Sequence, residues 1–219
     1  MSELQKKKFQ ECTNVSRETM NLFQSYYDIL INYQTKVNLI GSGTLRDIWL
    51  RHFLDSARLR SPILCLIQKN KSVPIKIIDV GTGAGFPGVV LSILLDKEKN
   101  LRFFLADSNI KKIRFLEALK SRLNLDVEII YSRAEVIEKK FDLIISRAVA
   151  NLDKLLKITY PLCKKNSVLI FLKGKRWKSE IKSLKKYWKF KNFIVKTKDC
   201  SVNSDGVILL IKELRKIHN

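Results

Sequence analysis

A glycine-rich segment at residues 75–88 carries the clearest chemical signal in this sequence. A short β-branched run at residues 75–80 contains Asp79 and leads into glycines at positions 81, 83, 85 and 88. Runs of this kind form buried strands of parallel sheets, and the glycines let the chain turn sharply into a following helix that begins near Pro87. The segment therefore predicts a loop that binds a nucleotide-type cofactor.

The acid at position 79 bears on the class of cofactor. Residues 83–88 also match the dinucleotide fingerprint, in which glycines bring a pyrophosphate onto a helix N-terminus. A carboxylate at the rim of the loop repels a pyrophosphate but suits a ligand with a cationic amino group and a ribose, such as S-adenosylmethionine. We therefore expect S-adenosylmethionine, and the alternatives are a dinucleotide or a tight turn that binds no ligand.

Polar residues after the later predicted strands could complete a cofactor site, because ligands of open α/β sheets bind beyond the carboxyl ends of the strands. Asp107 could accept hydrogen bonds from ribose hydroxyls, or it could cap the next helix. Ala134 and Glu135 could meet the edge of an adenine, or belong to an ordinary polar loop. The Arg147 guanidinium could hold the donor's carboxylate or a substrate phosphate, or form a surface salt bridge.

Candidates for the substrate side come from other segments. Arg51, His52 and Asp55 lie on a predicted helix, where His52 and Asp55 share a face and Arg51 can pair with Asp55. A role in locking the helices onto the sheet is commoner for such a cluster than direct catalysis. Asn38 could contact a base or form a turn. Lys173 follows the fifth predicted strand, beside the expected cleft.

Two devices used by other methyltransferases are missing from the sequence. No Asn/Asp-Pro-Pro-aromatic segment follows the fourth strand to hold an exocyclic amine, and no cysteine follows the fourth or fifth strand to attack a pyrimidine. Guanine N7 needs neither, because its in-plane lone pair can attack a sulfonium methyl group without first losing a proton. The rate would then come mainly from alignment of the reacting atoms.

Basic residues are in large excess over acidic ones. The formal net charge is +21, from 42 lysines and arginines against 21 acids, which favours association with a polyanion, most often nucleic acid. Residues 173–198 contain eleven basic residues and one acid, Glu180, interleaved with Trp177, Tyr187, Trp188 and Phe193. This pattern suits RNA, where phosphates bind cations and unstacked bases lie on aromatic rings. The alternative is an amphipathic helix whose aromatics face the sheet and whose lysines are only solvated.

Alternating strands and helices would position these residues. The predicted strands are 75–80, 101–106, 126–131, 141–146, 167–172, 192–198 and 207–213, and the predicted helices are 87–96, 109–123, 150–163 and 176–188. Residues 201–206 are too few for a helical crossover, so the last two strands should pair antiparallel. The predicted fold is α/β: a Rossmann-like, seven-stranded, mostly parallel sheet with a terminal antiparallel hairpin, as in class I methyltransferases that use S-adenosylmethionine.

The first 73 residues read as an N-terminal helical cap, and residues 74–219 as the methyltransferase domain. One amphipathic helix is indicated by apolar residues at three- and four-residue spacing, namely Leu22, Phe23, Tyr26, Tyr27, Leu30 and Ile31. After a break at residues 41–43, Thr44 is the predicted N-cap of a second helix that carries Trp49 and Phe53.

Several classes of protein are disfavoured by composition. No run approaches the roughly 18 apolar residues needed to span a bilayer, and the polar N-terminus lacks the apolar core of a signal peptide. We therefore expect a cytoplasmic protein, and a monomer. Cys12, Cys65, Cys163 and Cys200 lack C-x-x-C or Cys/His ligand spacing, so we expect inert thiols, with no bound metal and no disulfide framework.

Several of these segments together resemble one family. They are residues 37–39, 51–56, 78–88, 107–108, 111–112, 114–116, 132–135, 146–150 and 172–174, and they occur in one consistent order over roughly residues 20–175. In these segments the chain resembles the RsmG family, also called GidB, of small-subunit ribosomal RNA guanine-N7 methyltransferases. The phrase Gly-x-Gly-Phe-Pro-Gly together with Ser-Arg-Ala is the most discriminating part, whereas the lysine-rich tail after Lys175 matches less well.

The resemblance implies a bound S-adenosylmethionine and a target guanine, position 527, in the decoding region of 16S ribosomal RNA. The implied cofactor contacts are Gly81 and Gly83 of the loop, Phe86, Asp107, Ala134, Glu135 and Arg147. It does not identify the residues that touch the guanine, for which Asn38, His52 and Lys173 are the candidates. The alternatives are a methyltransferase for another RNA or a protein, an NAD-dependent oxidoreductase, and a non-catalytic RNA-binding protein with a vestigial loop.

Overall fold

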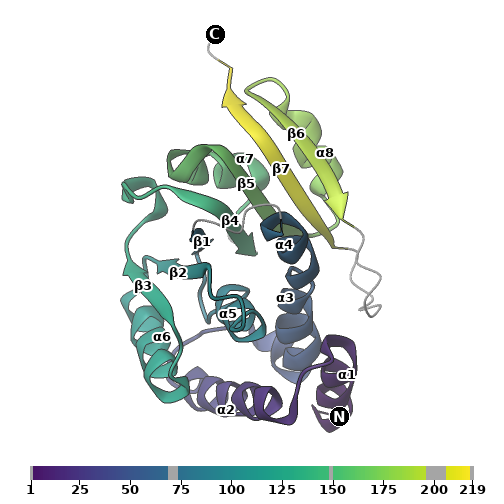
Figure 1. Ribbon diagram of the computed structural model, residues 1–219, viewed down its shortest axis with the longest axis vertical. Coiled ribbons are helices and arrows are strands. Elements are labelled where there is room, and N and C mark those ends of the chain that lie inside the picture. The colour runs from purple at the N-terminus through teal and green to yellow at the C-terminus, as the bar shows by residue number, and fades with distance from the viewer. Residues whose placement is uncertain (1, 69–73, 148–149, 196–205, 218–219) are drawn as a thin grey trace.

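A seven-stranded sheet organises the computed structural model, which describes residues 2–68, 74–147, 150–195 and 206–217 (Figure 1). The strands lie in the order β3-β2-β1-β4-β5-β7-β6. Their bounds are β1 Ile75–Val80, β2 Leu101–Asp107, β3 Val127–Tyr131, β4 Phe141–Arg147, β5 Cys163–Lys173, β6 Trp188–Val195 and β7 Val207–Lys216. The first five strands run parallel, and β7 pairs antiparallel with both β5 and β6. The predicted fold class, including the terminal antiparallel pair, is confirmed.

The strand order reverses between β1 and β4, which places the carboxyl ends of the central strands around one crevice. Val80 at the end of β1 pairs with Ala106 of β2, and Arg147 at the end of β4 pairs with Leu172 of β5. Open α/β sheets bind their ligands at such a switch point. The topology therefore directs Asp107, Arg147 and the glycine loop toward the same region.

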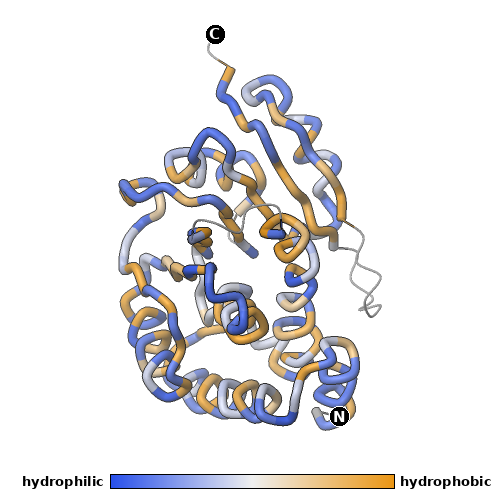
Figure 2. Tube along the Cα trace, viewed as in Figure 1, coloured by the Kyte–Doolittle hydropathy of each residue, from blue (hydrophilic) through white to orange (hydrophobic). Residues whose placement is uncertain are grey.

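Helices cover both faces of the sheet. Their bounds are α1 Ser2–Thr13, α2 Arg17–Gln34, α3 Asp55–Ala57, α4 Arg60–Ile67, α5 Gly88–Leu94, α6 Ile110–Leu123, α7 Leu152–Thr159 and α8 Trp177–Leu184, with short 3₁₀ turns η3 Ala134–Val136 and η4 Tyr160–Leu162. One core cluster joins the N-terminal helices, α5 and α6 to one face, and a second joins α7, α8 and the terminal strands to the other. Along α2, apolar residues recur at three- and four-residue spacing among polar ones (Figure 2), and the helix buries Met20, Phe23, Tyr26 and Leu30.

Aromatic side chains bind the N-terminal helices to the glycine loop. The rings of Phe23 and Phe53 meet edge to face at 5.6 Å between centroids, and Phe53 meets Phe86 at 5.3 Å. Tyr26 stacks on Phe86 at 5.5 Å. Aromatic pairs in these geometries stabilise a fold beyond the area they bury, so the helices hold a fixed position on the loop.

The segment around Thr44 differs from the prediction. Residues Ser42–Asp47 form a 3₁₀ helix, η1, and Trp49–Leu54 form a π-helix, η2. Gly41, rather than Thr44, is the N-cap of η1, and the Thr44 hydroxyl donates to the Gly41 carbonyl at 2.7 Å. The predicted N-cap was therefore wrong, because the Thr44 side chain is used within this turn.

The C-terminal elements also differ in their bounds. The helix predicted over 176–188 ends at Leu184, and β6 already begins at Trp188. Trp188 is buried in the second core cluster and pairs with Lys216 of β7, so packing and pairing favour the strand. The last residues of the strand predicted over 192–198 lie outside the described residues.

Among the described residues, no helix has both the length and the apolar character required to cross a membrane. Cys65 and Cys163 are free, whereas Cys12 is disulfide-bonded. The expectation of an unpaired thiol was wrong for Cys12, because disulfide formation depends on proximity in space, which spacing along the chain does not encode.

Candidate cofactor and substrate site

The glycine loop is held closely against the sheet. Gly83 has φ of +60°, and its amide donates to the Asp107 carboxylate at 3.0 Å. At Gly88, an added Cβ would lie 2.4 Å from Leu105 Cδ2 and 2.8 Å from Asp79 Oδ2. Only a residue without a Cβ lets the start of α5 approach β1 and β2 this closely.

Asp79 lies beneath this loop and not at its rim. Its side chain is 1% exposed, and Oδ2 accepts hydrogen bonds from the Thr82 hydroxyl at 2.6 Å and the Gly88 amide at 2.7 Å. Burial raises the pKa of Asp79 to about 7, against the lowering effect of these two hydrogen bonds. The expectation that this carboxylate faces the ligand was therefore wrong, because it is used to hold the loop and the first turn of α5.

Two cavities meet at the carboxyl ends of the strands. The first, of about 320 Å³, is lined by Ala134 and Glu135 and by residues from β1, β2 and α7. The second, of about 480 Å³, is lined by Gly83, Phe86 and Arg147 and by residues 39–41. Both are lined by Gly81, Asp107 and Ser108. All seven residues predicted to contact a cofactor thus line one or both of two adjoining cavities.

Asp107 joins the two cavities. Its Oδ2 accepts from the Gly83 amide, and its Oδ1 accepts from the Asn109 amide at 2.9 Å. Asn109, rather than Asp107, is the N-cap of α6, where its side chain accepts from the Lys111 amide. A carboxylate can accept about four hydrogen bonds, so Asp107 retains capacity for hydroxyl donors of a ligand.

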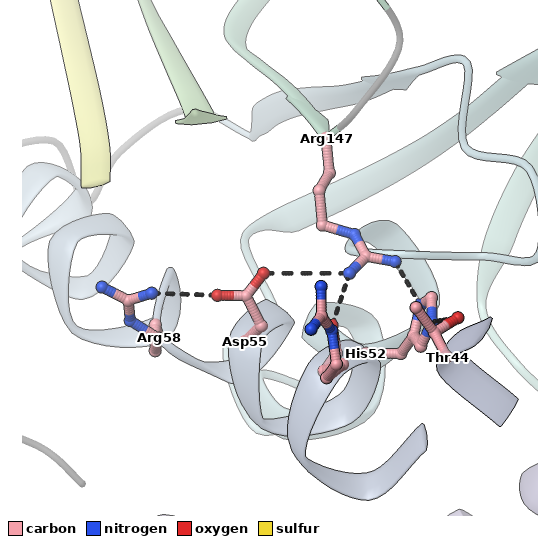
Figure 3. A network of polar contacts seen from close by, with 6 residues as sticks. Thr44, His52, Asp55, Arg58 and Arg147 are labelled. Carbon is pink, nitrogen blue, oxygen red and sulfur yellow. Dashed lines mark hydrogen bonds and ion pairs between the residues drawn. The ribbon is translucent and has the colours of Figure 1, made fainter. Parts of the chain in front are cut away.

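Arg147 links the end of β4 to the helical segment formed by η2 and α3 (Figure 3). Its guanidinium donates to the Arg51 carbonyl at 2.7 Å and to His52 Nδ1, and it lies 3.8 Å from Asp55 Oδ2. The other oxygen of Asp55 pairs with Arg58 at 2.9 Å. The guanidinium also lies 5.2 Å from the centre of the Phe86 ring, within range for a cation–π contact. Asp55 thus pairs with Arg58 and Arg147, and not with Arg51 as predicted.

His52 is held as a neutral imidazole. Because Nδ1 accepts from Arg147, the proton is on Nε2, which donates to the Thr44 hydroxyl at 2.8 Å. Burial lowers the pKa of His52 to about 3, and the nearby Arg147 and Arg51 charges lower it further. His52 lines the second cavity, but with both nitrogens engaged it is not a free base.

The other two substrate-side candidates lie outside the cavities. Asn38 is exposed in the loop after α2, although the next residues, Leu39 to Gly41, line the second cavity. Lys173 is buried, with Nζ 2.8 Å from Glu180 Oε2 and 3.1 Å from the Ala150 carbonyl. Its charge is thus used in an internal ion pair.

Two side chains beside the glycine loop, Lys112 and Tyr26, were not predicted from the sequence. Lys112 lines the second cavity, with Nζ 3.7 Å from where a Cβ on Gly83 would lie. Tyr26 donates from its hydroxyl to the Ala84 carbonyl of the glycine loop. Lys112 follows the strand end that carries Asp107, which is the signal that could have found it, whereas Tyr26 is indistinguishable in the sequence from the other apolar positions of its helix.

Comparisons with known proteins agree with this geometry. The family model described as GidB, rRNA small subunit methyltransferase G, matches residues 19–208. A ribosomal RNA small subunit methyltransferase G from Mycoplasma capricolum is 41% identical over 175 residues, covering 78% of this chain and 71% of that protein. Another from Bartonella tribocorum is 33% identical over 205 residues, covering 92% and 91%. The fold is similar to that of magnesium protoporphyrin IX methyltransferase from Synechocystis PCC 6803, with a TM-score of 0.56 at 11% identity, covering 86% of this chain and 97% of that one.

Proposed function

This chain belongs to the GidB family of ribosomal RNA small subunit methyltransferases, and we propose that it methylates N7 of guanine 527 in 16S ribosomal RNA. Family membership supports an enzyme that methylates small-subunit ribosomal RNA. The N7 position is supported by the chemistry of the site, and the numbered guanine by the resemblance of the motifs alone.

The observation that carries the proposal is the meeting of two cavities at Asp107. The residues present fit S-adenosylmethionine: Ala134 and Glu135 would hold the adenine end, and Asp107 would accept from the ribose hydroxyls. Arg147, beside Phe86, would hold the carboxylate of the amino-acid end. When bound, S-adenosylmethionine supplies a methyl group activated by a positively charged sulfur.

The titratable groups of the second cavity suit an acceptor that needs no base. His52 is neutral and accepts from Arg147, and both oxygens of Asp107 already receive backbone hydrogen bonds. Guanine N7 has a lone pair free to react and no proton to remove. The protein would then accelerate the reaction mainly by aligning guanine with donor.

We also propose that residues 1–73 act as a cap on a methyltransferase domain formed by residues 74–219. Support comes from His52 and residues 39–41, which form part of the wall of the second cavity. Tyr26 supports the same arrangement, because its ring stacks on Phe86 while its hydroxyl bonds to the loop. The cap would therefore help to form the pocket for the guanine.

Asp79 does not discriminate against a dinucleotide, because its carboxyl is buried and lines neither cavity. The features that disfavour a dinucleotide are Asp107 at the junction of the cavities, the terminal antiparallel strands and the family to which the chain belongs.

The test compares the two cofactors and then follows the methyl group. S-adenosylmethionine should raise the melting temperature, NAD should not, and label from the donor should appear as N7-methylguanosine in small-subunit ribosomal RNA. A thermal shift with NAD alone, or label on another atom or in protein, would contradict the proposal.

A further inference from the structure

A set of exposed cations lies on and beside α8. We call this set the lysine ridge and define it as Arg176, Lys178, Lys182, Lys185, Lys186 and Lys189. Lys178, Lys182 and Lys185 are spaced by four and three residues, so they share one flank of the helix. Figure 1 shows α8 beside β6, the edge strand of the sheet, away from α1 and α2. The ridge is thus a strip of positive charge at one side of the molecule.

The one acid of this segment does not neutralise the ridge. Glu180 Oε2 accepts from the buried Lys173 at 2.8 Å and from the Leu152 amide at the start of α7 at 2.7 Å. Nearby, Lys191 pairs with Glu213. Within the part of the chain that the structure describes, no ridge cation has a carboxylate within 4.0 Å. The ridge therefore presents uncompensated charge to solvent.

The aromatic residues interleaved with these cations are divided between core and surface. Trp188 is 4% exposed and Trp177 is half-buried, and both pack in the second core cluster. Tyr187 and Phe193 are 57% and 50% exposed. The tryptophans therefore pack mainly in the core, and only two exposed rings accompany the six cations of the ridge, so contact with a partner would come mainly from the cations.

The ridge begins near the carboxyl ends of the strands, where the candidate site also lies. Leu172 of β5 pairs with Arg147 of β4, and Arg147 lines the second cavity. The chain leaves β5 at Lys173 and reaches Arg176 three residues later. A long polyanion with one residue in the cavity could thus pass over the ridge.

We propose that the lysine ridge is a docking surface for the sugar-phosphate backbone of ribosomal RNA outside the target nucleotide. This inference rests on the proposed function, because it takes ribosomal RNA as the substrate. Lysine contacts to phosphates fix the position of a nucleic acid without reading its bases, and they weaken as salt rises. The ridge would therefore raise affinity for the RNA while leaving the chemistry in the cavity unchanged.

The test removes three charges from the ridge in the full chain with K178Q/K182Q/K185Q. The control, K97Q/K99Q/K165Q, removes the same charge from exposed lysines elsewhere. The probe is a transcript of small-subunit ribosomal RNA that includes the target region. We expect the ridge variant to bind it at least tenfold more weakly, with the slope of log Kd against log salt reduced by about two. The kcat at saturating RNA and the melting temperature should match those of the wild type, and the control should change Kd less than threefold.

Other outcomes would overturn the inference. Unchanged affinity and slope in the ridge variant would do so, as would an equal loss in the control, which would assign the effect to net charge. If the ridge variant kept its affinity for the transcript but lost binding to intact subunits, the ridge would instead be a binding site for an acidic protein surface. Methyl transfer is measured separately with wild-type protein, so failure of the proposed function is distinguished from failure of the ridge.

Discussion

Arg147 is one of several side chains that join the sheet to the N-terminal helices, and it also lines the second cavity. Its guanidinium bonds to a backbone carbonyl and to neutral His52, and Asp55 also pairs with Arg58, a contact that does not involve Arg147. Asp79 holds the glycine loop from below. We therefore propose separable roles for the two residues: Arg147 would bind the ligand, and Asp79 positions the loop.

Arg147→Ala should abolish methyl transfer and leave the fold intact. The variant would lose the charge-assisted hydrogen bonds from Arg147 to the carboxylate of S-adenosylmethionine, worth about 1.5–3 kcal/mol each. The affinity for S-adenosylmethionine should therefore fall by about a hundredfold. Calorimetric titration measures the affinity, circular dichroism checks the fold, and Arg102→Ala at an exposed pair with Asp126 is the control. Wild-type turnover by the Arg147 variant would remove this residue from the site.

Asp79→Asn should change how stability depends on pH. The pKa of Asp79 is raised from 3.8 to about 7, so between these values the folded state binds more protons than the unfolded state. The free energy of unfolding of the wild type therefore falls by up to about 4 kcal/mol through this group as the pH rises through that window. Asn does not titrate, so the stability of the variant relative to the wild type should increase from pH 5 to pH 8.

Urea denaturation at pH values from 5 to 8 measures this difference. Other groups, including His52, titrate in both proteins, so their contributions cancel in the difference between the two free energies of unfolding. A difference that stays constant with pH would show that the Asp79 carboxyl has the same pKa in the folded and unfolded states.

At the scale of elements, local pattern predicted most of the sheet. β1 has the predicted bounds, 75–80, because a β-branched run followed by glycines specifies both a strand and its end. The cavity residues were predicted because carboxyl ends of parallel strands converge. The bonds from His52 to Thr44 and Arg147 were not, because the histidine and arginine are 95 residues apart and their contact depends on the packed fold. The burial of Asp79 was missed although its partners Thr82 and Gly88 are close in the sequence, because the pattern of residue types does not show that the carboxylate lies beneath the loop.

Gly88→Ala should destabilise the junction of β1 and α5. The new Cβ would overlap Leu105 and Asp79 Oδ2, and overpacking of this kind costs about 1–3 kcal/mol. Gly174→Ala is the matched control, because nothing lies within 4 Å of its added Cβ. Thermal unfolding should show a lower melting temperature for the first variant only, and equal melting temperatures would mean that the loop can move away from β1 at no cost.

At the scale of the whole molecule, one core cluster joins the N-terminal helices to the glycine loop. The chain as a whole has a formal net charge of +21. The shared core gives the second cavity a wall from the helices, and the charge favours a polyanionic substrate. The proposed cap, the sheet and the lysine ridge would together let the enzyme hold its proposed target guanine while binding the RNA backbone around it.

The central claim is tested most directly by mapping N7-methylguanosine in small-subunit ribosomal RNA from cells that lack this protein. The account predicts that the modification at guanine 527 disappears and that the wild-type gene, but not one encoding Arg147→Ala, restores it. Persistence of the modification in the deletion strain, or loss of a different one, would contradict the account.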